Sequence, residues 1–247
     1  MEPLPTSLER EPLVDAVFEM RLASAHPLGD ILPGFLLHDL GEGTRVSRLP
    51  AADIPQPMRK DDPNLQFTPV QRIDVEGFSI LVGDRNIVIS CTLPYPKWPN
   101  FKMAIIDIIS RIGKLGLPGE VERYSLKYVN LLQAPTFEEQ IEKIEMSVRL
   151  GNLEVTKEHV SLQVHEREED TVHILSITTG ANGHIDGKAV TGALVDIDSI
   201  RHAKFPDVRS FSEGVEKGLE SLRQKNKEKF FSCLKFSTIQ EMGPTYE

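Results

Sequence analysis

Two histidines and two aspartates in the second half of the chain come closest to a catalytic or metal-binding set. His165 and His173 flank the acidic stretch 168–170. If that stretch is a three-residue hairpin turn, the two imidazoles sit opposite each other on one face of a strand pair. A neighbouring strand would present Asp196 and Asp198 on its own polar face. Two imidazoles with carboxylates form a donor set for a divalent transition metal.

A simpler interpretation is that these four residues are polar positions on the solvent face of an amphipathic sheet. We favour it, because no HExxH or comparable ligand spacing accompanies them. The motifs GxSxG, GxxxxGKS/T and GxGxxG are also absent from the sequence. We therefore predict no catalytic residue, and we expect neither a metal nor another cofactor.

Aromatic residues suggest a second candidate site. Trp98 begins a stretch with helical apolar periodicity, and Tyr124, Tyr128 and Asn130 fall on one side of an expected strand. These four residues could line a small-ligand pocket between helix and sheet. Aromatic residues at such spacing are more often core, so we expect Trp98 to be buried and Asn130 to be a hydrogen-bonded polar group.

The elements that must position these residues follow from hydrophobic periodicity and turn signals. Strands are expected at 13–22, 65–75, 78–82, 87–93, 121–132, 148–150, 160–165, 172–178 and 193–197. Helices are expected at 28–40, 98–115, 137–144 and 210–234. Ser210 and Glu213 have the spacing of a capping box at the start of the last helix. Asn226 is the one gap in the apolar stripe of that helix.

The expected strands are joined mostly by short turns, which favours antiparallel pairing. We therefore predict an α+β fold with two mostly antiparallel sheets, each covered by helices, and a long C-terminal helix. The stretch 134–136 is the expected boundary between an N-terminal half, 1–134, and a C-terminal half, 135–247. One continuous domain is the alternative.

Composition narrows the classes of function. The chain has 247 residues, 40% of them hydrophobic, and a net charge of −9. This acidic balance makes nucleic acid an unlikely partner, although a basic run occupies 223–229. The cysteines, Cys91 and Cys233, are far apart in sequence, which is typical of a reducing compartment. No signal peptide or apolar run of about 20 residues is present, so we expect a cytoplasmic protein without a membrane partner.

Several segments together resemble a known family. They are PLVDAVFEMR at 12–21, YPKW at 95–98, RYSLKYVN at 123–130 and DID at 196–198, followed by a helix ending in Phe230-Phe231. They are similar to a sporadically distributed family of uncharacterised prokaryotic proteins. In that family a histidine often precedes the final phenylalanine of the last helix, whereas Gln224 or Lys225 stands nearest here. The resemblance implies a cytoplasmic prokaryotic protein of an accessory system such as antiviral defence.

Taken together, these patterns favour a non-catalytic protein-binding or assembly module whose partner is another protein or a second copy, as in a homodimer. Two alternatives stay open. One is a metal-assisted hydrolase that uses His165, His173 and Asp196. The other is a small-ligand sensor with a pocket lined by Trp98 and Tyr128.

Overall fold

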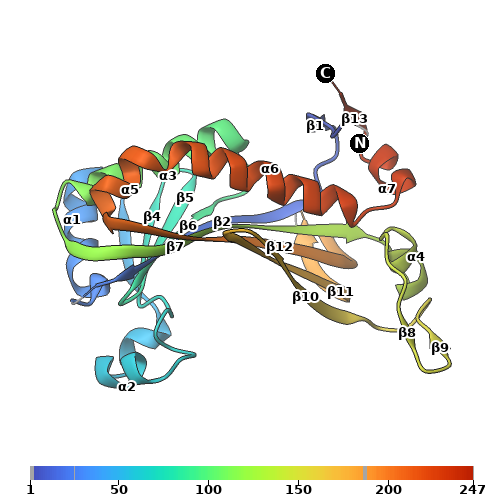
Figure 1. Ribbon diagram of the computed structural model, residues 1–247, viewed down its shortest axis with the longest axis horizontal. Coiled ribbons are helices and arrows are strands. Elements are labelled where there is room, and N and C mark those ends of the chain that lie inside the picture. Colours follow the sequence, from blue (N-terminus) through green and yellow to red (C-terminus); the bar gives the residue numbers. More distant parts are fainter. Residues whose placement is uncertain (1–2, 25, 186–187, 247) are drawn as a thin grey trace. The chain divides into compact units, whose positions relative to one another are not determined.

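A computed structural model describes residues 3–24, 26–185 and 188–246. The helices of these residues (Figure 1) are α1 (Leu28–Leu40), η1 (a 3-10 helix, Pro50–Asp53), α2 (Gln56–Asp61), α3 (Trp98–Gly113), α4 (Phe137–Glu142), α5 (Val208–Gly214), α6 (Glu216–Ser232) and α7 (Phe236–Glu241). The strands are β1 (Ser7–Leu8), β2 (Leu13–Ala23), β3 (Arg45–Arg48), β4 (Gln71–Val75), β5 (Phe78–Val82), β6 (Asn86–Cys91), β7 (Pro118–Gln133), β8 (Arg149–Leu150), β9 (Leu153–Glu154), β10 (Ser161–Glu168), β11 (Thr171–Ile185), β12 (Lys188–Asp207) and β13 (Pro244–Thr245).

One antiparallel sheet contains most of these strands. Within the described residues its nine strands follow the order β10-β11-β12-β7-β2-β6-β5-β4-β3. Two further sheets are small pairs, β1 with β13 and β8 with β9. The α+β class and the antiparallel pairing are confirmed, but the prediction of two helix-covered sheets is wrong. The two predicted groups of strands form one sheet because β12, from the second half, lies next to β7, from the first half, in the strand order. β12 also has 20 residues where five were expected.

The predicted single helix over 210–234 is two helices, α5 and α6, divided at Val215. The cap of α5 is Asp207, whose Oδ1 accepts a hydrogen bond of 2.7 Å from the Ser210 backbone N–H. Ser210 therefore lies inside the first turn, and the predicted capping box does not form the helix start. An Asp side chain at this position satisfies one of the N–H groups that have no partner within the helix.

The chain divides into two compact units, each assembled from separate segments. Unit 1 contains Met1–Val14, Lys127–Ser199 and Arg223–Glu247, and unit 2 contains Asp15–Leu126 and Ile200–Leu222. Neither unit coincides with the expected halves 1–134 and 135–247, because the segments of the two units alternate along the chain.

The core of unit 2 is organised around Phe211 of α5. Its ring lies 6.4 Å from that of Phe18 on β2, 5.3 Å from Tyr124 on β7 and 5.2 Å from Phe205 on β12, measured between centroids. Tilted and edge-on contacts of this kind add to the free energy gained by burying the rings. Aromatic side chains from three strands thus fix one short helix on the sheet.

A buried ion pair fixes α2 within unit 2. The guanidinium of Arg59 donates two hydrogen bonds of 2.9 Å to the carboxylate of Asp84. It also donates to the backbone carbonyls of Ala51 and Ile54. Arg59 is 6% exposed and Asp84 is 7% exposed, so water cannot replace these contacts. Arg59 thereby ties η1 and α2 to the turn between β5 and β6.

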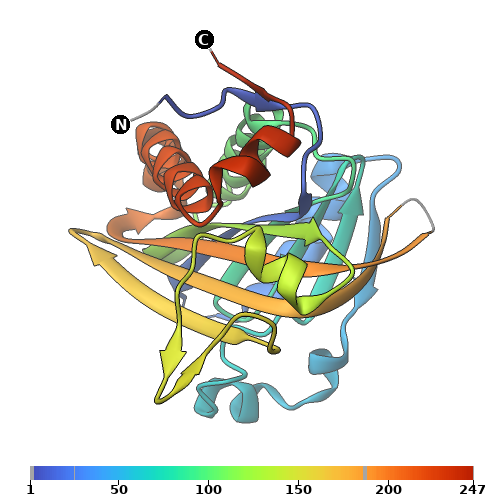
Figure 2. The same ribbon diagram turned by 90° about the vertical axis from the view of Figure 1, so that its right-hand side faces the viewer.

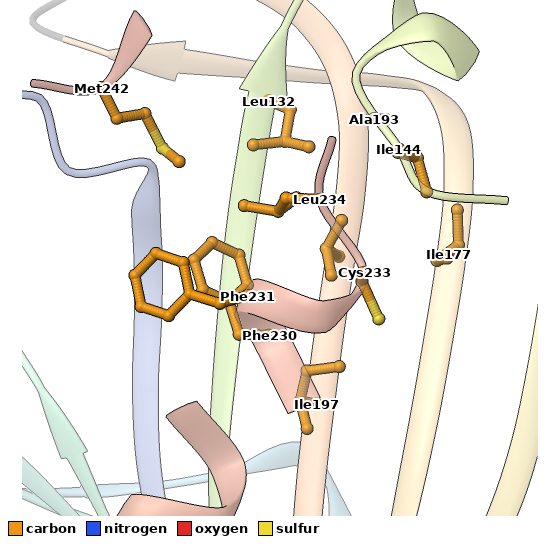
Figure 3. Close-up of a cluster of buried hydrophobic side chains, with 11 residues drawn as sticks. Leu132, Ile144, Ile177, Ala193, Ile197, Phe230, Phe231, Cys233, Leu234 and Met242 are labelled. Atoms are coloured by element: carbon orange, nitrogen blue, oxygen red, sulfur yellow. The ribbon is translucent and has the colours of Figure 1, made fainter. Parts of the chain in front are cut away.

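The core of unit 1 is a cluster of buried apolar side chains (Figure 3). Its members are Leu132, Ile144, Ile177, Ala193, Val195, Ile197, Phe230, Phe231, Cys233, Leu234 and Met242. Phe230 and Phe231, near the end of α6, lie 5.2 Å apart in an edge-on arrangement. The cluster joins residues of β7, β11 and β12 to the helical segment that follows them in sequence.

The first and last strands of the chain pair with each other in unit 1. In Figure 2 the dark blue segment that contains β1 and the dark red segment that contains β13 lie side by side at the top of the view. Ser7 of β1 is opposite Thr245 of β13, and the Thr6 N–H donates 2.7 Å to the Thr245 carbonyl. Leu4, which precedes β1, and Leu8, which lies in it, pack against the buried cluster.

Both cysteines are buried, Cys91 in unit 2 and Cys233 in unit 1. Burial raises the pKa of the Cys91 thiol to about 12 and also raises that of Cys233. In the part of the chain that the structure describes, no helix combines the length and the apolar character that crossing a bilayer requires.

Candidate functional site

The hairpin of β10 and β11 has a different register from the predicted one. Glu168 pairs with Thr171, so the turn contains two residues and not three. Glu169 in this turn has a φ of 50°, which is the left-handed region. As a result His165 is opposite Ile174 and His173 is opposite Glu166. A shift of one residue moves a side chain to the other face of a sheet, so the two histidines face opposite sides.

His173 lies inside unit 1 and is 0% exposed. Its Nδ1 is 2.9 Å from the Ser199 hydroxyl, which also accepts a 2.9 Å hydrogen bond from the Asn226 side-chain amide. The same amide donates 2.9 Å to the Ile197 carbonyl. The Ser199 hydroxyl can accept from Asn226 and still form the bond with Nδ1. The other ring nitrogen, Nε2, is buried and has no hydrogen-bond partner within the described residues. That nitrogen is 3.8 Å from a Glu168 carboxylate oxygen.

Ser199, His173 and Glu168 lie next to one another in space as the residues of a hydrolytic triad do, but their environment differs from that of an active site. Ser199 and His173 are both 0% exposed, so no substrate carbonyl can approach the hydroxyl. Burial lowers the pKa of His173, against the opposing influence of the nearby Glu168 carboxylate. A neutral imidazole enclosed between a strand and α6 serves packing and hydrogen bonding within the unit.

Lysines of α6 neutralise the acidic end of β10. Lys229 forms ion pairs with Glu168 and with Glu166, the latter at 2.9 Å. Lys225 lies 3.5 Å from Glu168. The hydrogen bond from Lys229 holds the pKa of Glu168 below its ordinary value. Part of the basic run over 223–229 therefore pairs with carboxylates of its own unit.

The two aspartates of the predicted metal set lie on β12. Asp196 and Asp198 flank Ile197, a core residue, so their side chains point to the opposite face. Asp196 forms a 2.8 Å ion pair with Lys127. His165 shares this face but lies beyond β11, and its Nε2 is 3.1 Å from the Gln163 side-chain oxygen. The set offers one imidazole to this face, not the two that the predicted centre requires.

The four residues of the predicted ligand pocket have separate environments. In unit 2, Tyr124 packs edge-on against Phe211, and the partly exposed Trp98 donates 2.9 Å to Glu220. The expectation that Trp98 is a core residue is therefore wrong, because its indole N–H lies at the surface.

In unit 1, Tyr128 and Asn130 are both buried on β7. The Arg223 guanidinium lies 4.5 Å from the centroid of the Tyr128 ring. A cation over an aromatic face is attracted by the electrons of the ring. Tyr128 is thus covered from α6 and does not face an open pocket.

Strand β10 presents the clearest binding feature of unit 1. Among the described residues it has a neighbouring strand on one side only, since it ends the order of the nine-stranded sheet. The Thr179 N–H donates 2.9 Å to the Val160 carbonyl, which identifies that facing pair as hydrogen-bonded. Hydrogen-bonded and non-hydrogen-bonded pairs alternate along an antiparallel ladder. The backbone groups of Ser161, Gln163, His165 and Arg167 therefore point away from β11, toward the edge.

A groove is the second binding feature of unit 1. It has a volume of about 710 Å³ and is bounded by the segment 3–5, α6, α7 and Tyr246. Leu4, Phe231 and Ile239 contribute apolar surface to it. Phe236 and Tyr246 are 63% and 40% exposed, so large aromatic surfaces border the opening. None of the residues that the sequence suggested for a pocket lines this groove.

Few features of the sequence indicated the buried polar contacts or the open edge of β10. Asn226 was visible as a polar gap in an apolar helix stripe, and such a gap indicates a buried polar partner. Its partner Ser199 had no distinguishing pattern. The open edge of β10 had none either, because strand order is a property of the whole sheet.

Neither the protein-family models nor the curated proteins with which the chain was compared contain a match to it.

Proposed function

We propose that this chain is a non-catalytic protein-binding module that assembles with another protein chain through the open edge of β10. The observation that supports the proposal is an exposed eight-residue strand whose outer backbone groups have no strand beside them in the described sheet. An added strand would satisfy those N–H and C=O groups, which is the basis of recognition by strand addition. The expected roles in an accessory prokaryotic system and in the cytoplasm belong to the same proposal.

The two edges of the nine-stranded sheet differ in how open they are. At the other edge β3 has four residues, and its Arg48 donates 3.1 Å to Asp53 and to the Ala52 carbonyl of η1. Short, charged and partly covered edges are typical of proteins that avoid strand pairing. β10 has eight residues, twice as many as β3, so it offers a partner more backbone groups. This contrast favours β10 as the edge that binds a partner.

The surroundings of β10 also suit a partner chain. Lys229 neutralises Glu166 and Glu168, which would otherwise repel an acidic strand. Val164 is 48% exposed and gives the edge an apolar contact that a partner could cover. Backbone pairing supplies affinity in strand addition, and side chains such as these supply specificity.

To test the proposal, the chain is co-expressed with the genes that flank its own gene, and the complexes are purified. A partner that binds through the edge should be retained by the unmodified chain and lost with Gln163→Pro, because proline removes an N–H that points outward. Asp53→Ala, at the opposite edge, is the matched control and should keep the partner. Retention by Gln163→Pro, or turnover of a phosphoester or peptide in a broad substrate screen, would contradict the proposal.

Small-ligand binding is a second candidate, favoured by the groove between α6 and α7. Its volume of about 710 Å³ lies within the range of ligand pockets, and much of its lining is apolar. Native mass spectrometry of the purified chain should then show a bound apolar molecule that Phe231→Ser releases. A single mass equal to that of the bare chain would argue against this candidate. For the hydrolase alternative, the opposite faces of His165 and His173 remove the proposed ligand set.

A further inference from the structure

We infer that the partner of the β10 edge is a second copy of this chain, paired antiparallel about a two-fold axis that passes through Val164. The inference rests on the proposed function, because it names the occupant of the same edge. Three properties of β10 support the inference: the alternation of its side chains, the direction of its backbone groups and the charges along it.

Side-chain alternation limits where the two-fold axis can lie. An axis perpendicular to the sheet keeps every side chain on its own face. Along β10 successive side chains alternate between the two faces. A residue must therefore be opposite one of the same face, which requires that the axis pass through a residue and not between two. The residues near the middle of the strand are Gln163, Val164, His165 and Glu166.

An axis at Val164 pairs seven of the eight residues of β10 without opposing like charges. Val164 is opposite Val164 of the second copy, and Gln163 is opposite His165. Leu162 is opposite Glu166, and Ser161 is opposite Arg167. No two like charges are directly opposed, and the largest exposed apolar side chain of the strand is covered by its own equivalent. Opposed like charges would destabilise a strand pair.

Axes at the other residues are less favourable. At His165 the two imidazoles face each other, and both apolar residues of the strand, Leu162 and Val164, are opposite glutamates, whereas the axis at Val164 places only Leu162 opposite a glutamate. At Glu166 two carboxylates face each other, which costs free energy. At Gln163 three strand residues, Glu166, Arg167 and Glu168, extend beyond the paired region, whereas only Glu168 does so for the axis at Val164. Charge, apolar pairing and paired length together favour the axis at Val164.

The backbone groups fit the same axis. The outward-pointing residues Ser161, Gln163, His165 and Arg167 are opposed only to one another, as 163 with 165 and 161 with 167. Each such pair exchanges two hydrogen bonds, so the two copies would form about eight. Val164 then occupies a non-hydrogen-bonded pair, in which the two Cα atoms are only about 4.5 Å apart.

A first experiment measures the mass of the chain in solution. One added strand buries less than the ~1,200 Å² of a standard interface, so a dissociation constant on the order of micromolar is expected. Light scattering should give a mass that rises with concentration from 27.7 kDa toward twice that value. Gln163→Pro should stay monomeric while keeping its circular dichroism spectrum, because the lost N–H points away from β11.

A second experiment tests the axis itself. Val164→Cys places two thiols within disulfide distance only if the axis passes through that residue. Mild oxidation should therefore convert this variant to a covalent dimer. Arg167→Cys is the matched control, because its equivalent in the second copy lies about 20 Å away along the strand. The natural thiols of Cys91 and Cys233 are buried and should not react.

Each outcome decides between the two proposals. A monomer at every concentration overturns self-pairing, as does a dimer that survives Gln163→Pro or cross-links at Arg167→Cys. If such a monomer still binds a co-expressed neighbour through the edge, the proposed function stands and only this inference fails. A chain that binds neither a second copy nor a neighbour contradicts both.

Discussion

Replacing Arg59 by methionine should be among the most damaging single changes in unit 2. The variant keeps an unbranched but shorter side chain, and it leaves the Asp84 carboxylate buried with no cation. It removes two charged hydrogen bonds of 2.9 Å, each contributing about 1.5–3 kcal/mol. It also removes the donors to the Ala51 and Ile54 carbonyls. Breaking a buried pair from one side costs about 3–5 kcal/mol, and we expect this range.

The partner variant and the double variant make the argument quantitative. Asp84→Leu should lower the free energy of unfolding by less than Arg59→Met does, because Arg59 keeps its two carbonyl acceptors. The double variant, Arg59→Met with Asp84→Leu, should be at least ~2 kcal/mol more stable than the sum of the single changes predicts. Urea unfolding followed by circular dichroism gives all three values. Single costs that add, or a loss under ~1 kcal/mol for Arg59→Met, would refute the assignment of this pair as the anchor of α2.

Three further predictions concern the stability of the chain and the reactivity of its thiols. Because burial lowers the pKa of His173, the free energy of unfolding should be highest above pH ~6.5 and should fall as the pH drops below it. Urea unfolding at several pH values should show that His173→Gln lacks this part of the decline. A variant with the same pH profile as the unmodified chain would contradict the assignment of the decline to His173. Trp98→Ala should cost about 1–2 kcal/mol, below the ~3–5 of a fully buried aromatic residue, because its indole is partly exposed; a larger loss in urea unfolding would show that the ring is core after all. Cys91 and Cys233 should react with a thiol reagent only in denaturant, since burial raises both pKa values and blocks access; fast modification of the native chain would disprove this.

Local elements were largely predictable because their signals are local. The expected helix over 28–40 matches α1, and the expected strand over 78–82 matches β5. Apolar periodicity and adjacent turn residues act over a few positions, so a single sequence contains them. The helix that begins at Trp98 was also predicted. The partial exposure of its first residue was not, because apolar periodicity does not say how deeply a helix end is covered.

The candidate site depended on features that the sequence does not express locally. Whether the turn before Thr171 contains two residues or three decides which face His173 occupies, and both turns are compatible with the acidic residues there. The open edge of β10 depends on strand order, which involves residues more than a hundred positions apart.

The pairing of β1 with β13 has a consequence for how the chain is made. Thr6 and Thr245 are 239 positions apart in the sequence. At synthesis rates of about 5–20 residues per second, roughly 12–48 s pass between the two reaching the ribosomal exit. During that interval Leu4 and Leu8 have left the ribosome, but the cluster on which they pack is incomplete. Unit 1 can close only when translation reaches its last strand, and a ribosome that stalls earlier leaves both leucines available to chaperones.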